Sequence, residues 1–168
     1  MIKKIDKYSY AHGTRFMDNG SRNYDVAGYR LPSVTTILGR TKDDTFLKDW
    51  IKKKGKKEAE RIKIASATRG TSMHKYLENY VLGKGYEDLT ELGQETKRMA
   101  QKVIEVGLAP VSGYFGSEVT VYYPGLYAGS TDLVGIHNDK ETIIDFKQAN
   151  RPKREEWIGD YKLQAGAY

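Results

Sequence analysis

Residues 127–147 contain two segments with strand character, Tyr127-Ala-Gly-Ser-Thr-Asp-Leu-Val-Gly-Ile136 and Glu141-Thr-Ile-Ile-Asp-Phe-Lys147. The polar residues His137–Lys140 between them have the composition of a tight turn. A third segment with alternating apolar residues, Phe115–Tyr123, comes just before. The pattern predicts an antiparallel meander of three strands joined by short turns.

The turn fixes which side chains face one another. If the hairpin turns symmetrically about Asn138 and Asp139, Asp132 faces Asp145. Lys147 shares their sheet face because side chains alternate with a period of two. Two carboxylates this close repel unless a cation lies between them or one is protonated. A divalent metal with a lysine beside it satisfies this condition, and a solvated ion pair on the hairpin face is the alternative.

Composition limits the function further. The chain has 168 residues, which suits a single domain, and it carries a net charge of +6 with a pI of about 9.3. This charge favours a polyanionic partner, nucleic acid first. The sequence has no cysteine, so a metal would need oxygen and histidine ligands. No apolar run approaches the ~20 residues of a membrane span. The N-terminus lacks the apolar core of a signal peptide, so we expect a cytoplasmic protein.

Helical periodicity precedes the strands, and an apolar stripe at Phe46, Leu47, Trp50 and Ile51 is its clearest instance. The predicted helices are a short one opened by Pro32 and Ser33, one from Asp44 to about Ile64 that breaks at Gly55, one from Thr71 to about Leu82, and one from about Leu89 to Gly107. Residues 1–30, with turn residues at Asp18–Ser21, are expected to form a hairpin or an irregular arm. A last helix is expected from Glu155 to Tyr168.

These elements predict an α+β fold in one domain, residues 1–168. A helical N-terminal half packs on a small mixed or antiparallel sheet, and a C-terminal helix closes it. Within the domain we distinguish the arm of residues 1–30, a helical part of residues 31–110, and a sheet with its helix in residues 111–168.

A histidine offers a third ligand. Gly70 permits close approach of the backbone or an unusual turn, and Thr71 is a suitable cap for the helix that follows. His74 and Glu78 then share one helix face. A histidine in such a position is usually a hydrogen-bonded boundary residue. It gains weight here because two opposed aspartates need another ligand, and a neutral imidazole is a suitable one.

Glu118 has two alternative positions that depend on the preceding turn. A two-residue turn at Pro124–Gly125 pairs Glu118 with Thr131, on the face away from Asp132. A three-residue turn that includes Leu126 pairs it with Asp132 and adds a third carboxylate. Both alternatives remain open from the sequence.

The last helix carries Gln164 and Tyr168 as i, i+4 neighbours, with small residues between them that allow a ligand to approach closely. Trp157, Tyr161 and Tyr168 also lie near helical spacing, so an aromatic core helix is an equal alternative.

Lys52, Lys53, Lys56 and Lys57 belong to a basic run around Gly55. Such a run is most often a solvated helix face. As a track for phosphates it would give salt-dependent affinity without sequence preference.

Several motifs in this order resemble the RecB-like branch of the PD-(D/E)XK nuclease superfamily: Gly70-Thr-x-x-His74, Asp132, Asp145-x-Lys147 and Gln164-x-x-x-Tyr168. The segment Leu31-Pro-Ser-Val-Thr-Thr-Ile37 is similar to one in the mitochondrial genome maintenance exonuclease group and its phage relatives. The resemblance covers roughly residues 31–168 and implies a restriction-endonuclease-like core. The family fold continues past its Gln/Tyr helix, which leaves three alternatives for this chain: a truncated core, a naturally minimal form, or half of an assembly.

The resemblance also implies roles. His74, Asp132, Asp145 and the backbone carbonyl of Phe146 would hold Mg²⁺ or Mn²⁺. Lys147 would activate or orient the attacking water. Contacts to DNA would come from Gln164, Tyr168, Thr71 and Ser33, with the lysine run as a further track.

The expected activity is that of a metal-dependent DNA exonuclease, with single-stranded DNA carrying a free end as the favoured substrate. The products would be a 5′-phosphate and a 3′-hydroxyl. A phage or bacterial cytoplasm is the favoured setting, with DNA repair or recombination as the process. The alternatives are a duplex-resecting or structure-specific nuclease, and a non-catalytic nucleic-acid-binding module with a vestigial site.

Overall fold

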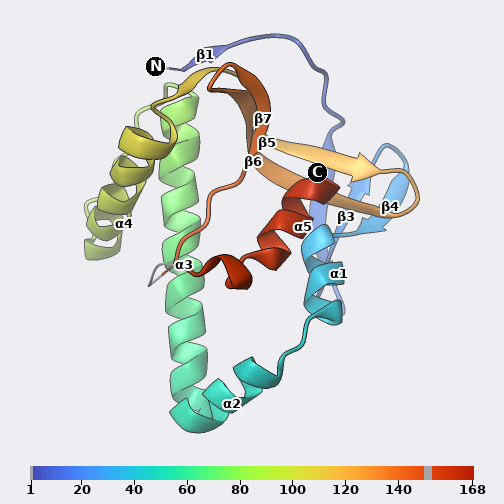
Figure 1. Cartoon of the computed structure of the whole chain (residues 1–168), viewed down its shortest axis with the longest axis vertical. Helices are drawn as coiled ribbons and strands as arrows, with labels where there is room; N and C mark the ends of the chain where they lie inside the picture. The colour runs from blue at the N-terminus through green and yellow to red at the C-terminus, as the bar shows by residue number, and fades with distance from the viewer. Residues whose placement is uncertain (1, 150–152) are drawn as a thin grey trace.

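The computed structural model describes residues 2–149 and 153–168, in which two β-sheets meet a long helix and a short C-terminal one (Figure 1). The strands are β1 Lys3–Lys4, β2 Gly13–Asp18, β3 Ser21–Val26, β4 Tyr29–Pro32, β5 Val111–Tyr123, β6 Tyr127–His137 and β7 Lys140–Ile144. The helices are α1 Val34–Thr41, α2 Thr45–Lys54, α3 Lys56–Val81, α4 Glu91–Lys102, a π-helical turn Val103–Gly107, a 3₁₀ turn Glu155–Trp157 and α5 Gly159–Ala167. The α+β class is confirmed, although the N-terminal half opens with four described strands.

The main sheet has the order β1-β5-β6-β7, with β1 parallel to β5 and the other neighbours antiparallel. The β6–β7 hairpin turns about Asn138 and Asp139, whose φ angles of 48° and 61° suit a type I′ turn. Leu133 pairs with Ile144, so the next step along the hairpin sets Asp132 opposite Asp145. The predicted symmetric turn is therefore confirmed.

Strand β7 is shorter than predicted. It ends at Ile144, so the expected strand through Lys147 is wrong in its last three residues. The backbone N–H of Phe146 donates to the carboxylate of Asp132. This contact replaces the next backbone hydrogen bond of the ladder and turns the chain across the end of the hairpin.

The β5–β6 turn decides the position of Glu118. Tyr123 pairs with Tyr127, which leaves a three-residue turn. Val119 pairs with Thr131, so Glu118 stands beside Asp132, as the second alternative predicted. Its φ of 53° interrupts the regular ladder there. Strand β5 also begins earlier than the predicted Phe115, at Val111.

The small sheet has the order β2-β3-β4 and comes from the segment expected to be a hairpin or an arm. Its first turn, at Asn19 and Gly20, has positive φ angles of 48° and 75°, and the turn predicted at Asp18–Ser21 is confirmed. A second hairpin turns at Ala27 and Gly28, with φ angles of 50° and 80°. An alanine in this conformation gives little sequence signal, which explains why the third strand was not predicted.

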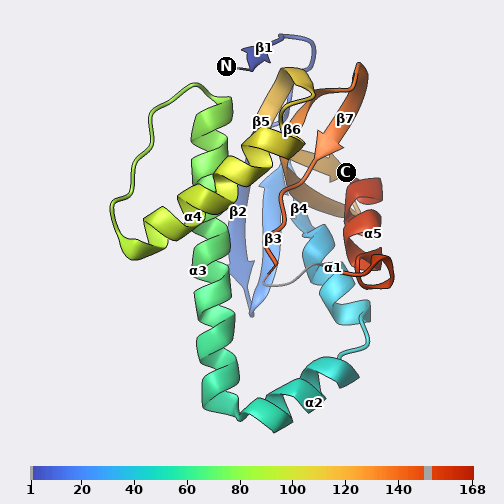
Figure 2. The same ribbon diagram turned by 60° about the vertical axis from the view of Figure 1, so that its left-hand side comes forward.

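Helix α1 starts where the sequence placed it. Ser33 is its N-cap, and Ser33 Oγ accepts a hydrogen bond from Thr36 N at 3.0 Å. Gly55, with φ of 83°, separates α2 from α3 as predicted. Helix α2 lies at the far end of α3 from both sheets (Figures 1 and 2), and none of its ten described residues is buried. Its apolar stripe is accordingly open to solvent, and Phe46 is 84% exposed.

Helix α3 is continuous over 26 residues. The separate helix predicted from Thr71 is therefore wrong, and Thr71 lies inside α3 instead of capping it. A glycine in a helix interior costs about 1 kcal/mol relative to alanine, which is a small penalty beside strong packing. Met73, Leu77 and Val81 supply that packing, because they recur every four residues and are buried in the core against the main sheet and α4.

The C-terminal helix is also interrupted. The chain forms the 3₁₀ turn, leaves helical geometry at Ile158, and then enters α5. The continuous helix predicted from Glu155 is wrong at this point. Trp157 is 56% exposed, so it does not belong to an aromatic core, whereas Gln164 is buried. Helix α5 packs beside α1 (Figure 1), and Lys42 forms an ion pair with Asp160 there. Among the described residues, no helix has the length and apolar character to cross a bilayer.

Candidate metal centre

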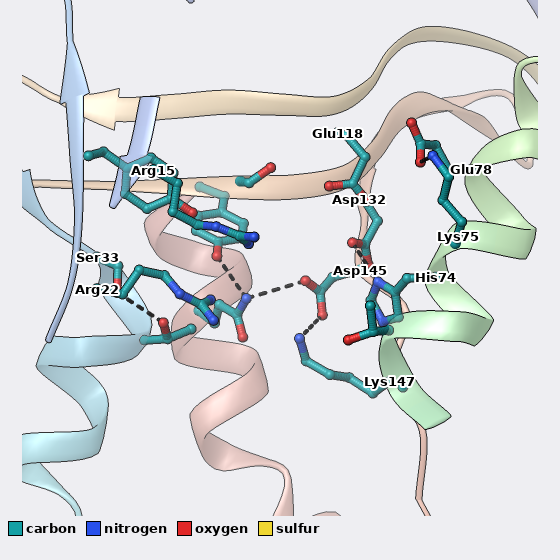
Figure 3. A pocket seen from close by; sticks show the side chains of 18 residues that line it. Arg15, Arg22, Ser33, His74, Lys75, Glu78, Glu118, Asp132, Asp145 and Lys147 are labelled. Carbon is teal, nitrogen blue, oxygen red and sulfur yellow. Dashed lines mark hydrogen bonds and ion pairs between the residues drawn. The ribbon is translucent and has the colours of Figure 1, made fainter. Parts of the chain in front are cut away.

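A cleft of about 460 Å³ lies between α3, α5, the start of α1 and the facing parts of the two sheets (Figure 3). Most of the residues predicted from separate motifs line it: Ser33, Thr71, His74, Glu118, Asp132, Asp145, Lys147, Gln164 and Tyr168. Lys52, Lys53, Lys56 and Lys57 do not belong to the described lining. They are exposed on both sides of the break between α2 and α3.

His74, Glu118 and Asp132 form a close group. One potential ligand atom from each residue lies within 4.8 Å of the others. His74 comes from α3, Glu118 from β5 and Asp132 from β6, so the fold brings three elements to one point. His74 Nδ1 lies 3.0 Å from Asp132 Oδ1. Two carboxylates and an imidazole are donors that could hold a metal ion.

Without a cation, the carboxylates of Glu118 and Asp132 repel each other. Partial desolvation on the cleft wall, followed by the negative charge of Asp132, raises the pKa of Glu118 to about 7, although the residue stays accessible to solvent. The hydrogen bond to Asp132 raises the pKa of His74, against the effect of burial. Asp132 itself is only 9% exposed. The raised pKa values favour the protonated forms of Glu118 and His74, and a bound metal ion would displace these protons.

Phe146 supports the group in two ways that the sequence did not reveal. Its backbone N–H donates to the second carboxylate oxygen of Asp132. Its ring packs edge-on against the His74 ring, with 6.1 Å between centroids. Both contacts follow from the position of Phe146 just beyond β7. They fix the orientation of the buried aspartate and of the imidazole.

Asp145 lies next to the close group and has different partners. Its carboxylate forms an ion pair with Lys147 and accepts a hydrogen bond from Gln164 Nε2 at 3.3 Å. Desolvation raises the pKa of Asp145, and the Lys147 ammonium opposes that rise. The ligand set expected from the resemblance contained Asp145. Among the described residues, the group whose ligand atoms lie within 4.8 Å of one another contains Glu118 instead.

Helix α5 positions Asp145 through Gln164 and Tyr168. Gln164 is 7% exposed, and its Nε2 also donates to the Tyr168 hydroxyl at 2.8 Å. The Tyr168 ring packs on the backbone of Gly129 in β6, where a Cβ would lie 2.2 Å from the ring. A glycine is required at this close approach. Burial raises the pKa of Tyr168 to about 12, so its hydroxyl stays neutral.

The cleft also contains cationic residues that the sequence did not single out. Arg15 and Arg22 come from the small sheet, and Lys75 comes from α3. The alternation of β2 and β3 would have placed both arginines on one face, but this requires knowing that the arm is a sheet.

Comparison with models of known protein families and with curated proteins finds no match for this chain.

Proposed function

We propose that this protein is a metal-dependent nuclease that hydrolyses phosphodiester bonds in DNA. The observation that carries the proposal is the close group of His74, Glu118 and Asp132 in the same cleft as the Asp145–Lys147 pair. The net charge of +6 supports a polyanionic substrate. The resemblance to RecB-like nucleases adds single-stranded DNA with a free end as the favoured substrate, and DNA repair or recombination in a bacterial or phage-infected cell as the setting.

The close group would hold the cofactor. His74, Glu118 and Asp132 offer the nitrogen and oxygen donors for Mg²⁺ or Mn²⁺. When bound, such an ion supplies Lewis-acid polarisation of a phosphate oxygen. The Phe146 amide keeps the Asp132 carboxylate in one orientation. Without the ion, the pKa of Glu118 is about 7, so the ion would displace a proton from this carboxylate near neutral pH.

Lys147 would act on the reacting phosphate. Its ammonium is paired with Asp145 and lies 5.6 Å from the centre of the Tyr161 ring. From this position it would orient a water molecule and offset negative charge that builds up on the phosphate oxygens. Gln164 holds Asp145 and thereby the lysine. The assignment gives the expected Asp-x-Lys pair a defined part in the reaction.

Two substitutions test the proposal. We expect Asp132→Asn and Lys147→Ala to reduce Mn²⁺-dependent cleavage of a linear single-stranded oligonucleotide at least about a hundredfold, since preorganised charge at the reacting group is worth that much. The matched controls are Asp139→Asn and Lys140→Ala in the exposed turn of the same hairpin. Cleavage at the unaltered rate in Asp132→Asn, with circular dichroism showing a normal fold, would contradict the proposal.

The choice of substrate separates the forms of nuclease. Linear single-stranded, circular single-stranded and linear duplex DNA are digested side by side. An exonuclease for single strands degrades the first and leaves the circle intact. Cleavage of the circle indicates a structure-specific endonuclease, and preference for the duplex indicates a resecting enzyme. Binding without turnover in Mg²⁺ or Mn²⁺ would indicate a nucleic-acid-binding module with a vestigial site.

A further inference from the structure

The small sheet presents two arginines to the cleft. Arg15 in β2 pairs directly with Tyr24 in β3, and Met17 pairs with Arg22. This register places Arg15 and Arg22 on one face of the sheet as diagonal neighbours, at a typical separation of about 7–8 Å. Figure 3 shows both side chains extending from the sheet into the cleft, on the side opposite His74 and Lys147.

The other cationic residues in the cleft have acidic partners. Lys147 pairs with Asp145, Lys75 lies 3.0 Å from Glu78, and His74 contacts Asp132. Within residues 2–149 and 153–168, neither Arg15 nor Arg22 forms an ion pair with a carboxylate. Arg15 interacts with the neutral hydroxyl of Tyr24. The cleft is thus divided into a carboxylate wall with its own cations and a facing wall with two positive charges left over.

Hydroxyl groups adjoin the arginines. Ser33 Oγ donates to Thr36 Oγ1 at 2.9 Å and accepts from Thr36 N, and Ser33 is only 2% exposed, so its hydroxyl caps the helix and is not a free donor to a ligand. Figure 3 shows Ser33 beside Arg22. The guanidinium groups are the donors that suit the oxygens of a phosphate, because each arginine can donate two parallel hydrogen bonds.

We propose that Arg15 and Arg22 form a phosphate-binding subsite for the substrate strand. The inference rests on the proposed nuclease function. In that function the phosphodiester to be cleaved lies at His74, Glu118 and Asp132, and the subsite would bind a second phosphate of the same strand across the cleft. Its role is to fix the register of the strand, so that one phosphodiester at a time faces the metal centre. The phosphate can be the terminal monoester of a strand or an internal diester.

The test removes both charges and measures binding without cleavage. The variant Arg15→Gln/Arg22→Gln keeps hydrogen-bonding groups at both positions. The control, Arg30→Gln/Arg98→Gln, removes the same charge elsewhere: Arg30 lies on the other face of the small sheet, stacked 4.5 Å from the Phe16 ring, and Arg98 is exposed on α4. The probe is an oligothymidylate of about 12 nucleotides, within the usual footprint of single-strand-binding proteins. It is used with a 5′-phosphate or a 5′-hydroxyl, in EDTA, and followed by fluorescence anisotropy.

We expect the Arg15/Arg22 variant to bind at least roughly tenfold more weakly and the control to stay within about twofold, since hydrogen bonds to charged groups are the stronger ones. A loss confined to the 5′-phosphorylated probe assigns the subsite to a terminal phosphate. An equal loss on both probes assigns it to an internal one. Affinity within about twofold of the unaltered chain, or an equal loss in the control, overturns the proposal.

Two further measurements keep the result clear. If melting shows that the double variant is unfolded, Arg22→Gln alone is compared with Arg30→Gln, with at least about a threefold loss expected and an equal effect of the two overturning the proposal. Turnover of the same probe by the unaltered chain in Mn²⁺ tests the nuclease function separately. Weaker binding by the arginine variant supports the subsite even without turnover, and normal binding overturns it even where cleavage is fast.

Discussion

Glu118 gives the candidate centre a pH dependence. Its pKa of about 7 lies above the ordinary 4.5, so between these values the folded, metal-free protein binds more protons than the unfolded chain. Stability of the metal-free protein should therefore fall as pH rises from about 5 to 8. His74 acts in the same direction because its pKa is also raised. Added Mn²⁺ should reverse the trend, since it takes the place of the proton.

Thermal melts of the unaltered chain and of Glu118→Gln, with and without Mn²⁺, measure this effect. The variant should lose part of the pH slope and most of the stabilisation by Mn²⁺ at pH 7.5, a buffer condition chosen just above the pKa of about 7. An unchanged response to Mn²⁺ in Glu118→Gln would remove this residue from the metal centre.

Gly129 is the second residue with a sharp consequence. An alanine there would place its Cβ against the Tyr168 ring and displace the Tyr168–Gln164–Asp145 chain of contacts. We expect Gly129→Ala to destabilise the protein by about 1–3 kcal/mol, as overpacking does, and to lower cleavage more than tenfold. Gly166→Ala in α5 is the control, because a Cβ there meets no neighbour within 4 Å. Urea unfolding and initial cleavage rates provide the two readouts.

The sequence predicted residue positions where geometry is local. A symmetric turn sufficed to set Asp132 opposite Asp145, and only two registers had to be weighed for Glu118. It could not predict that the Phe146 amide binds Asp132, because that contact depends on the strand ending early. Nor could the sequence predict that Arg15 and Arg22 line the cleft, because their position depends on how two sheets from distant parts of the sequence pack together.

At the scale of the element, α3 combines two faces. Gly70, Thr71, His74, Lys75 and Glu78 line the cleft, while the buried apolar residues form the adjacent stripe of the helix. Gly70 is inside the helix, and a Cβ there meets no protein atom within 4 Å. The structure alone gives no reason for a glycine at this position. Under the proposed nuclease function, room for a bound strand would be such a reason.

This gives a prediction with opposite signs for stability and activity. Gly70→Ala should stabilise the protein by about 0.5–1 kcal/mol, because alanine favours the helix, yet it should raise KM for the oligonucleotide several-fold. Gly39→Ala in α1 is the matched control: Gly39 is also helical with open space, and it is not part of the described cleft lining. It should gain the same stability with unchanged KM. Equal kinetics in both variants would show that Gly70 makes no room for substrate.

The prediction of elements succeeded where one signal dominated. Ser33 has a side-chain cap, and Gly55 has a positive φ, so the first helix start and the break were recognisable. The division of α3 at Thr71 failed because Gly-Thr resembles a helix start, and only the tertiary packing of Met73 and Leu77 shows that the helix continues. The small sheet was seen only in part, because its second turn uses Ala27.

At the scale of the whole molecule, the basic run around Gly55 and the candidate metal centre lie far apart along α3. The exposed lysines lie at the end of α2 and the start of α3, and His74 lies 17 positions beyond Lys57, which corresponds to about 25 Å along a helix. Under the proposed function, charges this far from the candidate metal centre would not act on a reacting phosphate through short-range contacts, since the Debye length is about 8 Å at physiological salt. Their effect should appear in binding alone.

Replacing Lys52, Lys53, Lys56 and Lys57 by glutamine should therefore weaken binding of a single strand and reduce its salt dependence, with kcat unchanged. Each phosphate that a lysine no longer neutralises should lower the slope of log K against log salt by about 0.7. The control replaces four exposed or partly exposed lysines elsewhere, Lys84, Lys97, Lys102 and Lys140, and should leave the slope nearly unchanged. Titrations at several salt concentrations, in EDTA, measure both. Equal slopes in the two variants would show that the run at Gly55 is only a solvated helix face, and a lower kcat would place it closer to the reaction than α3 allows.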